Sequence, residues 1–380
     1  MRDGSFALLW LHGPSGVGKS TVAWEIFGEL GRTGVDTVYV DVDQLGLCHP
    51  APGDDPGNER LKAANLAAVG SVVRDAGARG LLVSGILETA DAVRAYAERM
   101  PGIALTLCRL RAGERTLRDR ITARGWQPQL ADAAVQHAES LDRAETGELR
   151  VDTDGLSVAE VARLVREKTG WPPVVEGTAE RAIPPSTVDE GAAPMLWLCG
   201  PRGVGKSAVA WEIFAGLIGS GVRTAYVDLA QLGFRRPAPD DPGGHRLKAR
   251  NLGALWANFH AAGARCLIVS GGAGDQATVD RYLAAVPGTR PKVCLLRAGP
   301  AALTDRILRR GRGAGPPIPG DDLNGRSAED LRSLAERAAR EAEELDRAGI
   351  GDFRVDTGDR SAEEVARLVR ARTGDWPGLA

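Results

Sequence analysis

The sequence predicts an α/β protein of two tandem domains, each a three-layer unit with a parallel β-sheet between helices. Short apolar runs, such as Ala7–His12 and Leu81–Ser84, alternate with segments of helical spacing, such as Lys19–Leu30. This alternation is typical of parallel sheets whose strands are joined by crossover helices. The same succession of runs occurs a second time, and a length of 380 residues suits two domains better than one.

The second half of the chain repeats the first. The string at Trp24–Phe27 recurs at Trp211–Phe214, and many shorter identities follow in the same order. Each copy is far longer than the roughly 20–50 residues of a solenoid repeat, so each is expected to be a complete domain. The predicted divisions are domain 1 at 1–172, a proline-rich linker at 173–194, domain 2 at 195–380, and an insertion in domain 2 near 312–329.

The elements of domain 1 are predicted one by one from their local patterns. Strands are expected where a short apolar or β-branched run ends at glycine, aspartate or serine. Helices are expected where apolar residues recur every three or four positions. The last helix also begins with a capping box, Ser157 and Glu160, which Ser361 and Glu364 repeat in domain 2. In chain order the expected elements are strand Ala7–His12, helix Lys19–Leu30, strand Thr37–Val40, helix Leu61–Ala76, strands Leu81–Ser84 and Ile103–Leu107, helix Arg115–Arg124, strand Leu149–Val151 and helix Val158–Lys168.

Composition and charge exclude several classes of protein. The chain has 48 basic and 50 acidic residues, a net charge of −2, and no block of like charge. This balance gives no support for binding to nucleic acid or to a membrane surface. The sequence has no apolar stretch of about 18 residues and no signal-peptide pattern at its start. The five cysteines have neither disulfide nor metal-ligand spacing, so we expect a cytoplasmic protein with reduced thiols. The sequence does not predict an oligomeric state.

A glycine-rich loop follows the first expected strand of each domain. Gly13-x4-Gly18-Lys19-Ser20 matches the pattern GxxxxGK followed by Ser or Thr, and Gly200–Ser207 repeats the match. Glycines let backbone N–H groups surround phosphate oxygens, and the N-terminus of the following helix adds partial positive charge. Lys19 is expected to reach the β- and γ-phosphates of ATP, and the Ser20 hydroxyl to ligate Mg²⁺. The expected phosphate-binding residues are Gly13, Pro14, Ser15, Gly16, Val17, Gly18, Lys19, Ser20 and Thr21 in domain 1, and Gly200, Gly203, Val204, Gly205, Lys206, Ser207 and Ala208 in domain 2.

Three further motifs resemble those of a known family. In chain order they are Asp41-Val42-Asp43, Arg60-x-Lys62-x-x-Asn65 and Leu117-x-x-Arg120-Ile121-x-x-Arg124. The first resembles an Asp-x-Asp after the second strand, and the third the start of a kinase lid. The second resembles the Arg-x-x-Asn of adenylylsulfate kinases, with Lys62 in the place of the arginine. Each copy is thus similar to the small P-loop kinases of metabolites, which include adenylylsulfate kinase, gluconate kinase, shikimate kinase and the chloramphenicol phosphotransferases. The resemblance implies two P-loop NTPase domains of the nucleoside-monophosphate-kinase-like kind, which use ATP and Mg²⁺ to phosphorylate a hydroxyl of a small metabolite.

The same resemblance implies roles for individual residues. Asp41 would hold Mg²⁺ or help orient the nucleophile, and Asp43 would accept a hydrogen bond from the attacking hydroxyl. Arg124 would move over the transferring phosphate when the lid closes. The implied catalytic residues are Lys19, Asp41, Asp43 and Arg124, and the implied adenine-side residues are Arg120, Asp152, Arg306 and Asp356. The implied acceptor residues are Asp43, Arg60, Lys62, Asn65, Ser84 and Gly85, and the implied Mg²⁺ ligands are Ser20, Asp41, Ser207 and Asp228.

Domain 2 departs from this pattern, because it has Ala230 where domain 1 has Asp43. Domain 1 is therefore expected to be the working copy, and domain 2 to be impaired, altered in its acceptor, or a nucleotide-binding partner. Two other functions fit the same residues: a nucleotide-binding ATPase or switch with no phosphorylated acceptor, and a nucleotide kinase. For Arg60 and Asn65 a solvated helix face is the alternative, and for the arginines of the lid an amphipathic helix. Glu88 is a further candidate contact to the acceptor.

Overall fold

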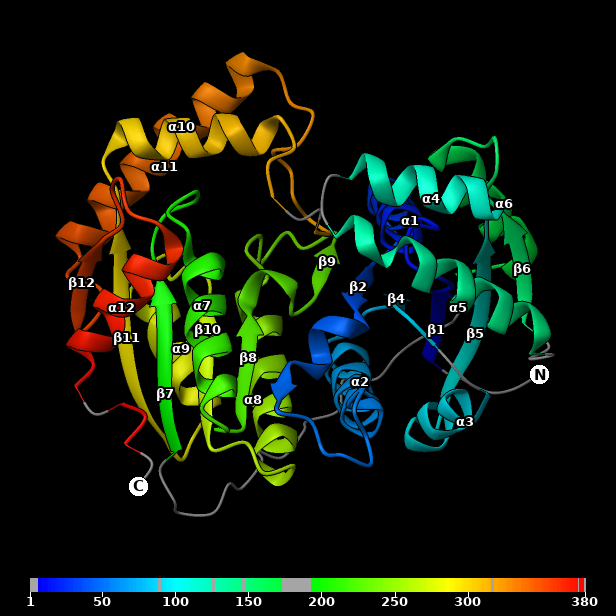
Figure 1. The fold of residues 1–380 in the computed structure, drawn as a ribbon, viewed down its shortest axis with the longest axis horizontal. Coiled ribbons are helices and arrows are strands. Elements are labelled where there is room, and N and C mark those ends of the chain that lie inside the picture. Colours follow the sequence, from blue (N-terminus) through cyan, green and yellow to red (C-terminus); the bar gives the residue numbers. More distant parts are fainter. Residues whose placement is uncertain are drawn as a thin grey trace.

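The computed structural model describes residues 6–87, 90–124, 127–144, 148–172, 193–315, 318–374 and 376–378. They form two α/β domains of the same design, each with a six-stranded sheet between helices (Figure 1). The predicted fold class is thereby confirmed. The predicted linker lies outside the described residues as far as 192, and Ala193 and Pro194 already belong to the first strand of domain 2. Glu88 also lies outside the described residues.

Every strand and helix predicted for domain 1 is present, with ends that differ by a few residues. Helices α3 and α5 were not predicted, although their apolar residues recur with helical spacing and the pattern alone indicated them. The elements of domain 1 are β1 Phe6–His12, α1 Lys19–Arg32, β2 Thr37–Asp41, β3 Cys48–His49, α2 Glu59–Asp75, β4 Gly80–Ser84, α3 Ala90–Arg99, β5 Ile103–Arg111, α4 Glu114–Ala123, α5 Ala131–Arg143, β6 Leu149–Asp152 and α6 Val158–Thr169, with short 3-10 turns η1 Val42–Gly46 and η2 Pro128–Leu130.

Domain 2 repeats this order of elements and adds the insertion. The insertion lies in the connection from α10 to α11 and also lengthens α11, which has 20 residues where its counterpart α5 has 13. The elements of domain 2 are β7 Ala193–Cys199, α7 Lys206–Gly219, β8 Thr224–Asp228, η3 Leu229–Gln231, β9 Phe234–Arg236, α8 His245–Ala261, β10 Cys266–Ser270, α9 Gln276–Ala285, β11 Thr289–Arg297, α10 Pro300–Gly311, α11 Ala328–Arg347, β12 Phe353–Asp356 and α12 Ala362–Arg372.

Five strands of each sheet are parallel, in the orders β6-β5-β1-β4-β2 and β12-β11-β7-β10-β8. Ser84 at the end of β4 stands beside Leu11 of β1 and Asp41 of β2. The carboxyl ends of these strands therefore meet at one edge of the sheet, where open α/β sheets bind their ligands. All seven residues of β1 are buried, because helices cover both faces of the sheet.

Each sheet is completed by a strand from the other domain. Strand β9 of domain 2 pairs antiparallel with β2, with Arg236 opposite Thr37. Strand β3 of domain 1 pairs antiparallel with β8, with Cys48 opposite Ala225. The predicted parallel sheets are present, and the exchanged antiparallel strand at this edge makes each of them mixed. Sequence reasoning missed the exchanged strands because they have only two and three residues, too few for a period-two pattern.

The two domains share a core and a set of polar contacts. Helix α2 packs against α8, and one cluster of buried apolar side chains includes residues of both domains. The Arg235 guanidinium donates to both carboxylate oxygens of Asp36, at 2.9 Å and 2.6 Å. The Arg236 guanidinium carbon lies 5.2 Å from the ring centre of Trp24 and 5.1 Å from that of Phe27. The halves of the chain therefore form one structural unit, with α2 and α8 side by side at its centre (Figure 1).

The five cysteines are free and buried, as the sequence predicted. No helix within the described ranges has the length and apolar character needed to cross a membrane.

Candidate active site

The segment Gly13–Ser20 of domain 1, which runs from the end of β1 into the first turn of α1, is called the phosphate loop here. Two of its glycines are needed for its shape, because Gly13 has φ 138° and Gly18 has φ 101°, both in the left-handed region. A Cβ on Gly13 would lie 2.5 Å from the backbone oxygen of Leu110. Lys19 turns its ammonium into the loop, where Nζ donates to the Gly13 and Pro14 oxygens, each at 2.9 Å. This cradle of backbone N–H groups and one ammonium fits the phosphates of a nucleotide.

The electrostatics of Lys19 link it to the residues predicted to act with it. Burial lowers the pKa of Lys19 to about 8, Asp43 and Asp41 oppose that change, and Arg124 adds to it. The other three predicted catalytic residues, Asp41, Asp43 and Arg124, are thus close enough to affect the charge of Lys19. An arriving phosphate would favour the charged ammonium further, since an opposite charge raises the pKa of a lysine.

Asp41 lies at the centre of a group of hydroxyls at the carboxyl edge of the sheet. The Ser20 and Ser84 hydroxyls each donate to Asp41 Oδ2 at 3.1 Å, and the Tyr39 hydroxyl lies 2.7 Å from Ser84 Oγ. Burial, followed by the charge of Asp43, raises the pKa of Asp41 to about 6. Carboxylate and hydroxyl oxygens are the hard donors that Mg²⁺ prefers. The Ser20–Asp41 pair therefore fits the predicted Mg²⁺ site.

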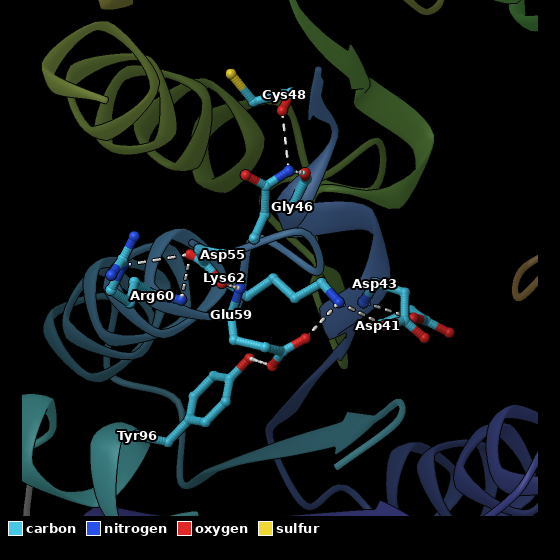
Figure 2. A network of polar contacts seen from close by, with 10 residues as sticks. Asp41, Asp43, Gly46, Cys48, Asp55, Glu59, Arg60, Lys62 and Tyr96 are labelled. Carbon is cyan, nitrogen blue, oxygen red and sulfur yellow. Dashed lines mark hydrogen bonds and ion pairs between the residues drawn. The ribbon is translucent and has the colours of Figure 1, made fainter. Parts of the chain in front are cut away.

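A second group of charges begins at Asp43 (Figure 2). Lys62 extends from the first turn of α2, with Nζ 3.4 Å from Asp43 Oδ1 and 2.9 Å from Glu59 Oε1. The Tyr96 hydroxyl donates to Glu59 Oε2 at 3.2 Å. Burial would lower the pKa of Lys62, but the charges and hydrogen bonds of Asp43 and Glu59 outweigh it and raise that pKa.

Sequence reasoning missed two members of this second group. Glu59 looks like the ordinary acidic residue of a first helical turn, where a carboxylate is favoured by the helix dipole. Tyr96 lies in α3, a helix that was not predicted. The repeat gives a signal that could have found both residues, because domain 2 keeps the tyrosine, as Tyr282, and replaces the glutamate by His245.

Two predicted acceptor residues are not brought to this group. Arg60 is exposed and donates to Asp54 Oδ2 at 2.7 Å, on the side of α2 away from Asp43 (Figure 2). Asn65 is buried; its Nδ2 donates to Leu45 O at 2.6 Å, and its Oδ1 accepts from Asn258 Nδ2 at 3.0 Å. The amide of Asn65 thus holds η1 and the domain interface rather than facing Lys62.

The remaining two predicted acceptor residues are at the sheet edge. Ser84 joins the hydroxyl group around Asp41, as described above. Gly85 has φ 152°, and a Cβ there would lie 2.2 Å from Cγ1 of Val42. Its lack of a side chain lets η1 approach the end of β4, so Gly85 shapes the site through the backbone.

The two arginines of α4 have different surroundings. The Arg120 guanidinium donates to Val17 O at 3.1 Å, to Thr153 Oγ1 at 2.9 Å and to Thr153 O at 3.0 Å, so it connects the phosphate loop to the turn after β6. Arg124 ends α4 and is exposed, with no hydrogen bond or ion pair to any described residue. Arg120 therefore has a fixed position, whereas Arg124 is available to a ligand.

A cavity of about 280 Å³ borders the phosphate loop at Pro14. Its lining also includes Gly113 after β5, Asp152 at the end of β6, and Asp154 in the turn that follows. The Asp152 carboxylate is exposed and lies 3.6 Å from Arg111. The predicted adenine-side residue Asp152 thus borders a space that continues from the phosphate loop.

Domain 2 repeats the phosphate loop and the predicted Mg²⁺ ligands. Lys206 Nζ donates to Gly200 O at 2.9 Å and to Pro201 O at 2.8 Å. The Ser207 hydroxyl donates to Asp228 Oδ2 at 2.6 Å. Arg306 repeats Arg120, donating to the backbone oxygens of its own loop and of the turn after β12. Asp356 lies at the end of β12 and is exposed, like Asp152.

Domain 2 differs at the group that begins with Asp43. Ala230 takes the place of Asp43, and His245, whose Nδ1 lies 3.1 Å from the Tyr282 hydroxyl, takes the place of Glu59. Lys248, the counterpart of Lys62, donates to Gly243 O at 3.0 Å and pairs with no carboxylate among the described residues. The scaffold of this group is kept, and its two carboxylates are lost.

The insertion brings acidic side chains to the phosphate loop and lid of domain 2. Asp321 forms an ion pair of 2.6 Å with Arg310, the counterpart of Arg124, and Asp322 pairs with Arg202 of the loop. Glu341 of α11 accepts from the backbone N–H of Arg202 at 3.3 Å. In domain 2, carboxylates of the chain itself therefore lie against the loop that would bind an anion.

Comparisons with known proteins add structural neighbours. No family model matches the sequence, and no curated protein matches it either. Among solved structures, the tunicamycin resistance protein of Deinococcus radiodurans has 22% identity and a TM-score of 0.33, over 48% of this chain and 96% of that one. A gluconokinase from Sinorhizobium meliloti 1021 has 21% identity and a TM-score of 0.32, over 44% and 97%. Shikimate kinase from Aquifex aeolicus has 13% identity and a TM-score of 0.29, over 48% and 96%.

Proposed function

We propose that the protein is a kinase that transfers the γ-phosphoryl group of ATP to a hydroxyl of a small molecule, and that domain 1 carries the reaction. The observation that supports this proposal most is the arrangement of domain 1 at one sheet edge. There the Lys19 ammonium, the Ser20–Asp41 pair and the Asp43–Lys62 pair follow one another. This order gives places for phosphates, for Mg²⁺ and for an acceptor hydroxyl.

In the proposed reaction the acceptor oxygen attacks the γ-phosphorus, and the bond from that phosphorus to the bridging oxygen of ADP breaks. The phosphate loop and Lys19 hold the phosphates, and Asp43 accepts the hydrogen bond and then the proton of the attacking hydroxyl. Ser20 and Asp41 would hold Mg²⁺, which neutralises charge on the phosphates when bound. Arg124, free of partners in the described structure, would approach the transferring group as α4 and its lid close.

Domain 2 supports the assignment of catalysis to domain 1. It has a complete phosphate loop, but Ala230 cannot accept a proton in the place of Asp43. Its lid arginine, Arg310, is paired with Asp321, and its loop contacts Asp322 and Glu341. We propose that domain 2 does not phosphorylate the acceptor and that its main role is structural, because β9 completes the sheet of domain 1 and α8 packs against α2.

The proposal is tested by single lysine substitutions in the full-length protein. Purified protein is incubated with ATP, Mg²⁺ and a panel of sugars, nucleosides, amino alcohols and antibiotics, and products that gain one phosphoryl group are detected by mass spectrometry. Lys19→Ala should reduce product formation at least about a hundredfold, since Lys19 stabilises transition-state charge. Lys206→Ala should leave most of it.

Three results would contradict the proposal. Equal losses from the two lysine variants would show that both domains contribute to the reaction. Release of ADP that no acceptor stimulates would favour the nucleotide-binding ATPase or switch, whereas phosphorylation confined to nucleoside monophosphates would identify a nucleotide kinase.

A further inference from the structure

We propose that the acceptor of domain 1 is an alcohol without an anionic group, either uncharged or carrying an amine. This inference rests on the proposed function, because it concerns the acceptor side of the same site. It is carried by the charges of Asp43, Glu59 and Lys62, and by the change of the same three positions in domain 2.

The three charged groups leave negative charge facing outward. One ammonium, that of Lys62, is shared by two carboxylates, at 3.4 Å from Asp43 and 2.9 Å from Glu59. The Lys62 side chain is only 14% exposed, whereas that of Asp43 is 41% exposed and that of Glu59 is 31% exposed. The two carboxylates are therefore more accessible to a ligand than the ammonium that lies between them (Figure 2).

The neighbouring charges do not reverse this balance. Arg60 is engaged by Asp54 at 2.7 Å and by Asp55 at 3.5 Å. Burial raises the pKa of the Tyr96 hydroxyl, and the charges that raise it further are those of Glu59, Asp43 and Asp55. The internal segments of domain 1 outside the described residues, 88–89, 125–126 and 145–147, contain no lysine or arginine in the sequence.

Two further cations of the described structure, Lys19 and Arg124, belong to the phosphate loop and to the end of α4. Lys19 donates to oxygens of the phosphate loop, and the charge of Arg124 acts on Lys19. The proposed reaction uses both cations for the phosphates of ATP. A carboxylate, sulfate or phosphate on the acceptor would therefore face Asp43 and Glu59 without a cation to pair with, and like-charge contacts of this kind select strongly against a ligand. An amine would instead pair with these carboxylates.

Domain 2 shows that these charges can change while the frame stays. Its Tyr282 and Lys248 keep the places of Tyr96 and Lys62, but Ala230 and His245 replace both carboxylates. Helix α8 and the Tyr282 contact form without these carboxylates, while Lys248 turns to the Gly243 oxygen, so the carboxylates are not needed to build the helix. Their presence in domain 1 is therefore best explained by the ligand that they face.

The experiment uses full-length protein with Lys206→Ala and acceptors in matched sets that share a carbon skeleton. Each set pairs an uncharged alcohol with its carboxylate or phosphate, and with its amine where one exists: glucose, glucosamine, gluconate and glucose 6-phosphate form one set, and adenosine and AMP another. We expect the accepted skeleton to be phosphorylated as its uncharged or amine member, and its anionic member to react at least about tenfold more slowly. Glu59→Gln should raise the relative rate of the anionic member about tenfold, whereas the matched variant His245→Gln in domain 2 should not change it.

Each outcome decides the inference. An anionic member that reacts as fast as its uncharged partner overturns it and leaves the proposed kinase function standing. A preference for uncharged members that Glu59→Gln leaves unchanged also overturns it, because the carboxylates would not be its cause. Hydrolysis of ATP with no phosphorylated acceptor of any charge overturns the proposed function, and the inference with it.

Discussion

At the scale of single residues, the site is built around the Asp41 carboxylate, whose charged form is less stable in the folded protein than in water. Asp41 accepts hydrogen bonds from Ser20, Ser84 and the backbone N–H of Asp43, yet its pKa is raised to about 6 by burial and by the Asp43 charge. At neutral pH the charged carboxylate therefore costs stability. Mg²⁺ bound at this position would remove that cost by supplying opposite charge.

We predict that Asp41→Asn abolishes Mg²⁺-dependent ATP binding by domain 1 and raises the free energy of unfolding at pH 7 by about 1–2 kcal/mol. Because the folded-state pKa of Asp41 lies above its ordinary value, this group stabilises the fold most below about pH 4, and that contribution falls as pH rises through about 6. The gain from Asp41→Asn should therefore be smaller at pH 4.5 than at pH 7. Urea unfolding at both pH values measures it, and a loss of stability at pH 7 would contradict the prediction.

The residues that could be predicted from the sequence are those whose position the backbone fixes. The phosphate loop places Lys19 and Ser20, and the end of β2 places Asp41 and Asp43, in any sheet of this topology. Arg60 could not be placed, because its direction depends on how the first turn of α2 is rotated, and Asp54 competes for it. For Asn65 the difficulty is larger, since its partner Asn258 belongs to the other domain.

At the scale of elements, the lid differs between the two domains because its connection to the next helix differs. After α4 the chain of domain 1 has only a short connection to α5, and Arg124 has no partner in the described structure. After α10 the insertion supplies Asp321 and Asp322, and the Pro319 oxygen accepts from Gln231 Nε2 at 3.1 Å. The insertion is thus attached both to the lid of domain 2 and to η3.

We predict that these acids weaken nucleotide binding by domain 2. In a Lys19→Ala background, which isolates domain 2, combining Asp322→Asn with Glu341→Gln should tighten ATP binding at least about tenfold, because two like charges next to the triphosphate are removed. Equilibrium dialysis or calorimetry measures the affinity. The matched control is Asp305→Asn, which removes an acid from an exposed pair with Arg309 on α10 and should have no effect.

A binding affinity that the double variant leaves unchanged would show that the acids do not compete with nucleotide.

The strands β3 and β9 illustrate the limit of prediction at this scale. Every longer strand of domain 1 was predicted, and so were all of its helices except α3 and α5, but the two exchanged strands depend on contacts between distant parts of the chain.

At the scale of the whole molecule, neither sheet is complete without the other domain. Phe234 of β9 packs against Trp24 and Tyr39 of domain 1, with ring centres 4.8 Å and 6.0 Å apart, and Tyr39 in turn contacts Ser84 beside Asp41. A continuous path of contacts therefore leads from domain 2 to the Asp41 carboxylate of domain 1.

We predict that the two domains unfold in one transition. Far-UV circular dichroism and tryptophan fluorescence should give the same midpoint in urea, because breaking the interface exposes the core that both domains share. Phe234→Ala should move this single midpoint down, by about 2 kcal/mol in free energy, as a partly buried aromatic is lost. Two separate transitions, or a shift confined to one probe, would contradict this prediction.

The reciprocal exchange of β3 and β9 has a consequence for how the copies can diverge. In a complex of two identical chains, any residue change appears in both sites at once, and the association weakens on dilution. Here the covalent connection gives each half its partner at a fixed effective concentration, whatever the amount of protein. One half can then lose Asp43 and Glu59, as Ala230 and His245 record, and still provide the strand that completes the sheet of its neighbour. Within one chain, a domain can therefore keep its structural contribution to its neighbour while its own site changes.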